Sequence, residues 1–372
     1  MYDIAIIGAG INGCSLAFEF TQLNKKVMLF DSESVASGGS GAAGAFISPK
    51  FSKSGELKEL INDSFVYSMD YYERNFPHLL TKAPLLHIAK DDLESKTLKF
   101  YKNITKLKLN DLSTINTENL TTNALNQEQV SLNTGVINAK SVCEAMSKDA
   151  KFIKHTVENL IYDDGIWIID DLYSAKNVII TTGAYEQIIK EPYIELRGVW
   201  GHRIDIKTRS ENPYSIHQFV SISPSKDGIL AIGATHNTHY HPQKTKEPYD
   251  FDKGRAELLE KASKTINLDN VEIIKDYTGL RSGSFDYMPI VGNLVMSNET
   301  ILNCGNKLKV KNADYKKFTY YPNLYMMNGN GGYGFVLAPY LAKILSQHII
   351  SNKEISDRIS PARFFARWAK KR

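Results

Sequence analysis

Hydrophobic and polar positions in the first 31 residues predict a strand, a helix and a second strand in close succession. Residues 2–7 form a short apolar run, and Leu16, Ala17 and Phe20 follow at helical spacing. A second apolar run covers residues 26–30. This order is typical of the first unit of an α/β fold with a Rossmann-like sheet.

A glycine-rich turn precedes the helix, and an acid ends the second strand. Glycines at a strand end let the backbone approach a pyrophosphate, whose charge is stabilised by the amides and dipole of the following helix. Asp31 lies 18 residues beyond Gly13 and can accept a hydrogen bond from a ribose hydroxyl. The glycine pattern alone also occurs in ordinary turns, but in this order it predicts a dinucleotide site. The expected binding residues are Gly8, Gly10, Ile11, Asn12, Gly13, Asp31 and Ser32.

Three further segments are rich in the small residues that a close approach to a bulky ligand requires. Residues 37–50 combine glycine and alanine with Phe46 and Ile47, which a solvated linker would not favour. Residues 181–184 and 328–334 place glycines after apolar runs, and plain turns are the alternative. The expected contacts are Gly39, Ser40, Gly44, Ala45, Val157, Thr182, Gly183, Gly329, Asn330, Gly331, Gly332, Tyr333 and Gly334.

Helical and strand patterns interleave over the rest of the chain. Residues 80–130 have no recognisable chemical signature, and from residue 196 the apolar period changes towards two. The expected helices cover residues 54–76, 139–146, 256–262 and 335–349, and the expected strands cover 160–162, 166–169, 178–182, 201–206, 217–222, 229–233 and 324–327.

Glycine motifs near both ends of the chain would contribute to one nucleotide site, so we expect a discontinuous nucleotide-binding domain. Its predicted segments are residues 1–77, 135–190 and 324–372. Residues 78–134 and 191–323 would form an inserted, β-rich substrate domain.

Composition limits the alternatives without deciding among them. With 372 residues and 42% hydrophobic content, the chain can bury one large core or two moderate ones. Its three cysteines are widely spaced, so we expect no disulfide framework, no zinc site and a reducing cytoplasm. The clustered His236, His239 and His241 suggest a solvated loop rather than a metal site. We expect neither a signal peptide nor a transmembrane segment, and the net charge of +4 only permits an anionic partner.

The order of these motifs resembles that of the D-amino-acid-oxidase-like (DAO) family of FAD-dependent amine oxidoreductases, along nearly the whole chain. The chain matches the family's glycine fingerprint at residues 8–13 and its G-x-I-N-P-like turn at 135–138. It matches the A-T-G-A strand end at 181–184, the substrate arginine at Arg281 and the C-terminal glycine loop at 329–339. The resemblance implies FAD as the cofactor, held by a discontinuous Rossmann-like domain with an inserted substrate domain, as in glycine and sarcosine oxidases. We expect non-covalent attachment, because no cysteine is suitably placed to bond the flavin.

Within the family, residues 38–49, 232–235 and 361–367 resemble the FAD domain of bacterial enzymes that modify the wobble uridine of tRNA. The chain departs from that pattern at Ala42, Gly332 and the pair 198–199, which puts the substrate in doubt. The resemblance implies oxidative removal of the carboxymethyl group from 5-carboxymethylaminomethyl-(2-thio)uridine, giving aminomethyl-uridine and glyoxylate. A free amino-acid oxidase or dehydrogenase and a non-catalytic nucleotide-binding regulator are the alternatives.

Two cationic side chains are candidates for the substrate site. Arg281 matches the family's substrate arginine, and its planar guanidinium suits a carboxylate; a surface ion pair with Asp286 is the alternative. Lys50 would add a second positive charge, unless it is simply solvated. Residues 331–334, at the start of a helix, would place free amides near negative charge that develops on the flavin.

Two basic segments with interleaved aromatic residues suggest tRNA as the partner, since cations reach phosphates and rings stack on bases. A solvated hairpin and an amphipathic helix are the alternatives, and the tail would also suit an anionic membrane surface. The first segment contains Lys307, Lys309, Lys311, Tyr315, Lys316, Lys317, Phe318, Tyr320 and Tyr321, and the second contains Arg358, Arg363, Phe364, Phe365, Arg367, Trp368, Lys370, Lys371 and Arg372.

Overall fold

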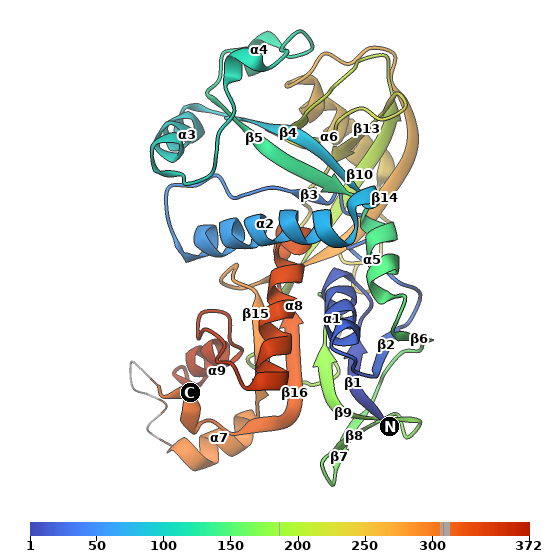
Figure 1. Cartoon of the computed structure of the whole chain (residues 1–372), viewed down its shortest axis with the longest axis vertical. Coiled ribbons are helices and arrows are strands. Elements are labelled where there is room, and N and C mark those ends of the chain that lie inside the picture. The colour runs from blue at the N-terminus through green and yellow to red at the C-terminus, as the bar shows by residue number, and fades with distance from the viewer. Residues whose placement is uncertain (186, 306–307, 309–312) are drawn as a thin grey trace.

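Two eight-stranded sheets form the two halves of the computed structural model, which describes residues 1–185, 187–305, 308 and 313–372 (Figure 1). The first sheet has the order β15-β16-β9-β1-β2-β6; β8 also pairs with β9, and β7 pairs with β8. Its strands are β1 (Tyr2–Ile7), β2 (Val27–Asp31), β6 (Lys151–Lys154), β7 (Leu160–Asp163), β8 (Ile166–Ile169), β9 (Tyr173–Ile180), β15 (Ile290–Val295) and β16 (Tyr320–Asn328).

Strand β1 is buried on both faces, which explains its continuous apolar sequence. Ile4 and Ile6 pack into one hydrophobic core, and Ala5 and Ile7 pack into another on the opposite face. β1 runs parallel to both β2 and β9, and β16 runs parallel to β9. The carboxyl ends of these four strands therefore meet at one edge of the sheet.

Helices cover one face of this sheet, and a smaller layer covers the other. The first core contains side chains from α1, α2, α5 and α8, and Figure 1 shows α8 beside α1, below α2. On the second face, Phe365 of α9 is fully buried. The helices are α1 (Ile11–Gln22), α2 (Glu56–Asn75), α5 (Ala139–Ser147), α7 (Ser297–Cys304), α8 (Gly334–Ser351) and α9 (Ala362–Ala369).

The second sheet has the order β14-β10-β13-β12-β11-β4-β5-β3, and its longest pair is the antiparallel β10 and β14. Helix α6 packs on this sheet, because its Leu258 and Ala262 share a hydrophobic core with Ile204 of β10 and Ile232 of β13. The strands are β3 (Phe46–Ile47), β4 (Leu80–Ile88), β5 (Gln129–Ile137), β10 (Leu196–Lys207), β11 (Ser215–His217), β12 (Ser221–Ile222), β13 (Ile229–Gly233) and β14 (Glu272–Ser284), and the helices are α3 (Asp92–Ile104), α4 (Thr122–Leu125) and α6 (Phe251–Ser263).

The structure differs from the sequence prediction in several elements. The single strand expected at 217–222 is a hairpin, because β11 and β12 turn back on each other. Residues 80–130, which had no signature, contain β4, α3 and α4. β6 was missed because its residues are mostly exposed and lysine-rich.

The strand pairing also departs from the predicted domain boundaries in two places. β15 lies within residues 191–323, yet it pairs antiparallel with β16 in the first sheet. β3 pairs with residues 135–136 of β5 in the second sheet. The strand with which each short segment pairs decides the sheet to which the segment belongs. The sequence does not show which strand that is.

Candidate active site

A cavity of about 950 Å³ lies where the carboxyl ends of β1, β2 and β9 face the second sheet. This is the crevice in which open α/β sheets bind ligands. Lys50, Gly13 and Gly329 do not line it, although all three were expected at the site. The expected residues that do line it are Gly8, Gly10, Ile11, Asn12, Asp31, Ser32, Gly39, Ser40, Gly44, Ala45, Val157, Thr182, Gly183, Arg281, Asn330, Gly331, Gly332, Tyr333 and Gly334.

The glycines after β1 are required by close backbone contacts. Gly8 has a φ of +108°, and a Cβ there would lie 2.6 Å from the carbonyl oxygen of Thr181. A Cβ on Gly13 would lie 1.9 Å from the carbonyl oxygen of Gly8. Gly13 therefore acts from outside the cavity, by letting α1 pack directly against the turn.

The carboxylate of Asp31 is held at the end of β2 by three donors. Its Oδ2 accepts a hydrogen bond from the amide of Ala9 at 2.9 Å. Its Oδ1 accepts from the hydroxyl of Ser37 at 3.0 Å and from the amide of Glu33 at 3.1 Å. These bonds orient an acceptor toward the cavity that Asp31 lines.

Asparagines join the first glycine turn to the loop before α8. The Asn330 side-chain amide donates to Oδ1 of Asn12 at 2.6 Å, and the Asn12 amide donates to the carbonyl of Met327 at 3.1 Å. Asn330 Oδ1 is buried and has no partner among the described residues. The N-terminus of α8 follows directly, with Gly334 lining the cavity.

These residues fit FAD. The turn at 8–13 is narrow enough for a pyrophosphate to approach backbone amides, and Asp31 offers an acceptor for a ribose hydroxyl. The free amides at the start of α8 face the same cavity, where the isoalloxazine would lie. The individual cofactor contacts stay predictions.

Arg281 of β14 presents a half-buried guanidinium to the cavity. The group lies over Gly201 of β10, where a Cβ would approach its Nη2 to 2.7 Å. Its Nη1 donates to the carbonyl of Thr235 at 3.1 Å. Burial lowers the pKa of Arg281, and no carboxylate among the described residues pairs with it. Such a site favours an incoming anion.

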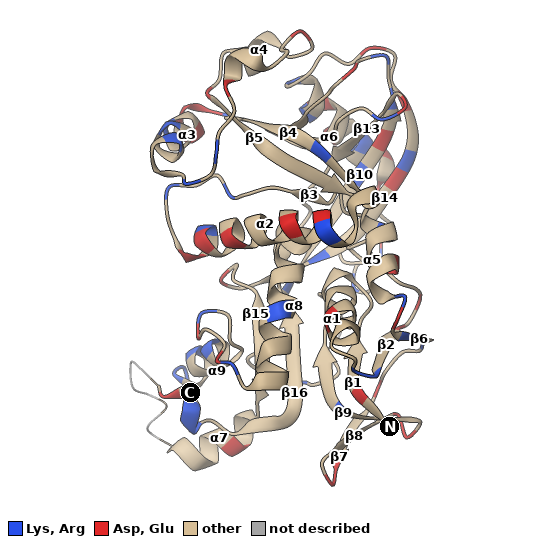
Figure 2. Ribbon diagram, viewed as in Figure 1, with Lys and Arg blue, Asp and Glu red and all other residues tan. Residues whose placement is uncertain are grey.

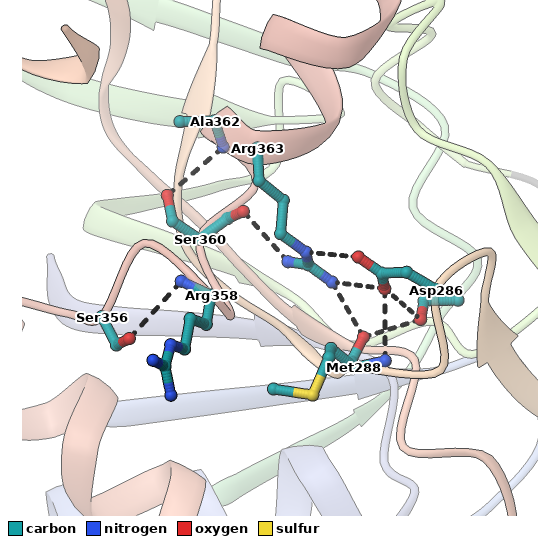
Figure 3. A network of polar contacts seen from close by, with 8 residues as sticks. Asp286, Met288, Ser356, Arg358, Ser360, Ala362 and Arg363 are labelled. Carbon is teal, nitrogen blue, oxygen red and sulfur yellow. Dashed lines mark hydrogen bonds and ion pairs between the residues drawn. The ribbon is translucent and has the colours of Figure 1, made fainter. Parts of the chain in front are cut away.

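The alternative partner of Arg281 is engaged elsewhere (Figure 3). The guanidinium of Arg363 donates to both oxygens of Asp286, at 2.9 and 3.0 Å, and also to the carbonyl of Met288. The surface ion pair between Arg281 and Asp286 is therefore excluded. Arg363 instead fixes the start of α9 to the loop after β14.

Lys50 does not line the cavity but contacts Tyr333, which does. Its amine lies 5.6 Å from the centre of the Tyr333 ring, which lines the cavity. Burial lowers the pKa of Lys50 and raises that of Tyr333 to about 12. Its catalytic role stays a prediction.

Sequence reasoning missed the wall that the second sheet contributes. Arg203, Ser221 and His217 line the cavity from β10, β12 and β11. Burial and the nearby charges of His87 and Lys90 lower the pKa of His217 to about 3. None of these residues belongs to a glycine motif, and only the alternation of side chains along short strands could have indicated them.

The two basic segments have different outcomes. Lys307, Lys309 and Lys311 lie outside the described residues, while Lys316 pairs with Glu354 and Lys317 with Asp314. These pairs reduce the positive charge that the first segment offers to an anionic partner.

In the second segment, two of the three aromatic side chains do not face solvent. Phe364 and Phe365 are buried in the core under the first sheet, and Trp368 packs against the same core. The interpretation of this segment as a base-stacking surface is therefore wrong for Phe364 and Phe365, because burying them stabilises α9 against the sheet. Arg367 and residues 370–372 are exposed, whereas Arg363 is held by Asp286, and Figure 2 shows Lys and Arg gathered at α9.

Arg367 and Arg197 lie over one ring at this surface. Their guanidinium carbons are 4.2 and 4.5 Å from the centre of Phe285, which is partly exposed. Neither arginine has a carboxylate partner within the described part of the chain. Two neighbouring cations without an anion favour a negatively charged partner.

Other potential sites are absent from the described residues. No group of three or more His, Cys, Asp or Glu side chains is placed to hold a metal ion there. In the same residues, no helix is both long and apolar enough to cross a membrane. Cys14, Cys143 and Cys304 are free thiols, and none lines the cavity.

Comparison with known proteins agrees with this architecture. The chain is 24% identical to the tRNA 5-methylaminomethyl-2-thiouridine biosynthesis bifunctional protein MnmC of Legionella pneumophila (strain Lens), over 96% of this chain and 56% of that protein. It is 26% identical to the MnmC of Campylobacter jejuni (strain RM1221), over 99% of this chain and 59% of that protein. The chain thus spans less than two thirds of these relatives.

Solved structures show the same fold. Glycine oxidase from Geobacillus kaustophilus superposes with a TM-score of 0.73 at 18% identity, covering 95% of this chain and 96% of that one. L-proline dehydrogenase from P. horikoshii superposes with a TM-score of 0.74 at 16% identity, covering 98% and 97%. The family model for the FAD dependent oxidoreductases (DAO) matches residues 3–348. The chain is therefore an FAD-dependent oxidoreductase of the DAO family.

Proposed function

We propose that this enzyme oxidises the carboxymethylaminomethyl group of the tRNA wobble uridine, releasing glyoxylate and leaving an aminomethyl base. Similarity to the MnmC proteins over nearly the whole chain supports this substrate. A cytoplasmic location, where tRNA is modified, follows from the proposal.

The observation that carries the proposal is the unpaired guanidinium of Arg281 in the cavity. Arg281 is half-buried, and its one hydrogen-bond partner among the described residues is the Thr235 carbonyl, so it offers a largely desolvated, planar donor pair to a carboxylate. The carboxymethylaminomethyl group ends in such a carboxylate, next to the CH2 that must be oxidised. Binding the carboxylate would therefore fix which carbon faces the flavin.

The protein's part in the reaction is orientation and stabilisation of charge. Bound FAD would accept the hydride that leaves the CH2 between the carboxylate and the nitrogen. Free amides at the N-terminus of α8 would stabilise negative charge that develops in the cavity. Loss of the hydride leaves a C=N bond, to which water adds, and cleavage gives glyoxylate and the amine.

Anaerobic mixing tests the reaction directly. The purified holoenzyme is mixed with tRNA that contains 5-carboxymethylaminomethyluridine, and the visible absorbance of the oxidised flavin is followed over time. We expect bleaching, stoichiometric glyoxylate and the aminomethyl nucleoside in the digested tRNA. If glycine, sarcosine or a D-amino acid bleaches the flavin while the tRNA does not, the enzyme is a free amino-acid oxidase or dehydrogenase. If nothing does, the regulator alternative replaces the proposal.

The tRNA partner has a separate test at the Arg197–Phe285–Arg367 surface. Replacing Arg197 and Arg367 with alanine should weaken tRNA binding and reduce the slope of log affinity against log salt by about one unit per lost phosphate contact. Lys316→Ala is the matched control, because Lys316 already pairs with Glu354. An unchanged slope in the double variant would exclude this surface from tRNA binding.

A further inference from the structure

The cavity has a polar wall that carboxylate binding at Arg281 does not use. Cross-strand register aligns Arg203 with Gly233, Gly233 with Ser221, and Ser221 with His217. All four line the cavity, so they form one continuous row across β10, β13, β12 and β11. With about 4.8 Å between neighbouring strands, the row is about 14 Å long.

Two members of the row have unused hydrogen-bonding groups. No hydrogen bond to the Ser221 hydroxyl, or to either ring nitrogen of His217, forms within the described part of the chain. His217 Nε2 is buried, and its ring packs edge-on against Phe46 with 5.0 Å between ring centres. The Ser221 hydroxyl and Nδ1 of His217 are not buried, so a ligand in the cavity can supply the partners that the protein does not.

The other two members shape the row. A Cβ on Gly233 would lie 2.8 Å from Cγ of Arg203, so glycine leaves room for the arginine stem. Arg203 stacks on Tyr277, with 3.8 Å from its guanidinium carbon to the ring centre, and its Nη1 donates to the carbonyl of Ala43. Its Nη2 lies 3.7 Å from Oδ1 of Asp205, and its buried Nε has no hydrogen-bond partner among the described residues. The row thus offers donors at one end and groups that donate or accept at the other.

The distance from Arg281 to the row fits the substrate proposed above. The Arg281 guanidinium lies over Gly201, two residues along β10 from Arg203, hence about 7 Å from the row. In a carboxymethylaminomethyl group, four bonds separate the carboxylate carbon from the pyrimidine, which is about 5 Å. A carboxylate on Arg281 would therefore place the attached ring against the row.

We propose that the row formed by Arg203, Gly233, Ser221 and His217 is a nucleobase subsite that binds the carbonyl and N–H edge of a pyrimidine ring. The inference rests on the proposed function and adds to it how a nucleoside is distinguished from a free amino acid. A small N-alkylglycine would use only Arg281 and leave the row unfilled.

The test compares two substrates in the holoenzyme. Flavin reduction is measured anaerobically with N-ethylglycine and with the nucleoside 5-carboxymethylaminomethyluridine. His217→Phe keeps the ring that packs on Phe46 but removes both nitrogens, and Ser221→Ala removes the hydroxyl. Each variant should lower the second-order rate constant for the nucleoside about tenfold, the effect of one lost hydrogen bond, and leave the constant for N-ethylglycine unchanged.

Ser215→Ala is the matched control. Ser215 lies two residues before His217 on β11, is buried, has an unpartnered hydroxyl and does not line the cavity. It should leave both constants unchanged. FAD content and reduction by N-ethylglycine confirm that each variant is folded. Equal effects on both substrates, or no effect on the nucleoside, would overturn the subsite.

Uridine binding separates failure of the subsite from failure of the proposed function. Uridine lacks the reactive arm, so its binding is measured by the change in flavin absorbance and requires no turnover. We expect saturable binding that His217→Phe weakens about tenfold. If uridine binds in this way but the modified nucleoside is not oxidised, the function is wrong and the subsite stands. Millimolar uridine is enough to detect even a weak ligand. If uridine does not bind at that concentration, the subsite is wrong.

Discussion

Replacing Arg281 with methionine should change activity and stability in opposite directions. Methionine keeps an apolar stem of similar length but removes a guanidinium whose only partner among the described residues is the Thr235 carbonyl. In the free enzyme this group is a largely desolvated cation with no counterion in the described part of the chain, which is destabilising. In the substrate complex it would be paired and oriented, which is why the enzyme retains it.

The two effects have different sizes. Truncating one partner of a buried, charge-assisted pair costs about 2–5 kcal/mol, which lowers the rate constant for flavin reduction about 30- to 5,000-fold. Removing the unpaired charge should stabilise the fold by about 1–2 kcal/mol. For 372 residues the unfolding entropy is about 0.8 kcal/mol/K, so Tm should rise by about 1–3 °C.

Anaerobic stopped-flow with N-ethylglycine measures the first effect, and thermal unfolding followed by flavin fluorescence measures the second. Arg281→Lys should restore activity only in part, because an ammonium lacks the planar fork. Arg255→Met is the control: Arg255 is outside the cavity and bonds Asp276 at 2.9 Å, so its loss should lower Tm without affecting reduction. Equal reduction rates for wild type and Arg281→Met would refute the assignment of the carboxylate site.

Three further predictions concern other parts of the molecule. Asp31→Ala should weaken FAD retention at least about tenfold, measured by flavin release on dilution, since it removes the ribose acceptor and leaves the Ala9 amide unpaired; denaturation should release all flavin from the wild type. The pKa of His217 in the folded protein is about 3, below its usual 6.5, so the unfolded chain takes up the proton first as the pH is lowered. The free energy of unfolding should therefore fall by up to about 1.4 kcal/mol per pH unit from pH 6.5 to about 3. Urea unfolding of His217→Phe should lack this component. Arg363→Ala should lower Tm, because it leaves the Asp286 carboxylate without its bidentate partner; an unchanged Tm would mean that the buried side chains of α9 are enough to hold this helix.

The sequence predicted the parts of the fold in which local and tertiary requirements coincide. The β1–α1–β2 unit was recognisable because a strand buried on both faces must be apolar throughout, and because the contacts of Gly8 and Gly13 admit no side chain. Arg281 was recognisable from its place in a family pattern. Its guanidinium proved to lie in the cavity rather than on Asp286.

The polar row could not be predicted, because it depends on the register of four strands. Arg203, Gly233, Ser221 and His217 are separated in sequence, and a shift of one residue in any pair would turn a side chain to the other face. Two aromatic rings of the tail were misinterpreted for a related reason. Amphipathic helices that cover a core and those that bind a partner have the same periodicity, and only the position of α9 against the first sheet distinguishes them.

The hydrogen bond between Asn12 and Asn330 has a consequence for biosynthesis. The two residues are 318 positions apart. Asn330 follows β16, which pairs with β9 rather than with an N-terminal strand. At about 5–20 residues per second, the ribosome needs roughly 16–60 s between them. The N-terminal nucleotide motif therefore leaves the ribosome long before its other wall exists. FAD would be captured only after this wall has been synthesised, so the flavin supply sets how long each new chain persists in the less stable apo form.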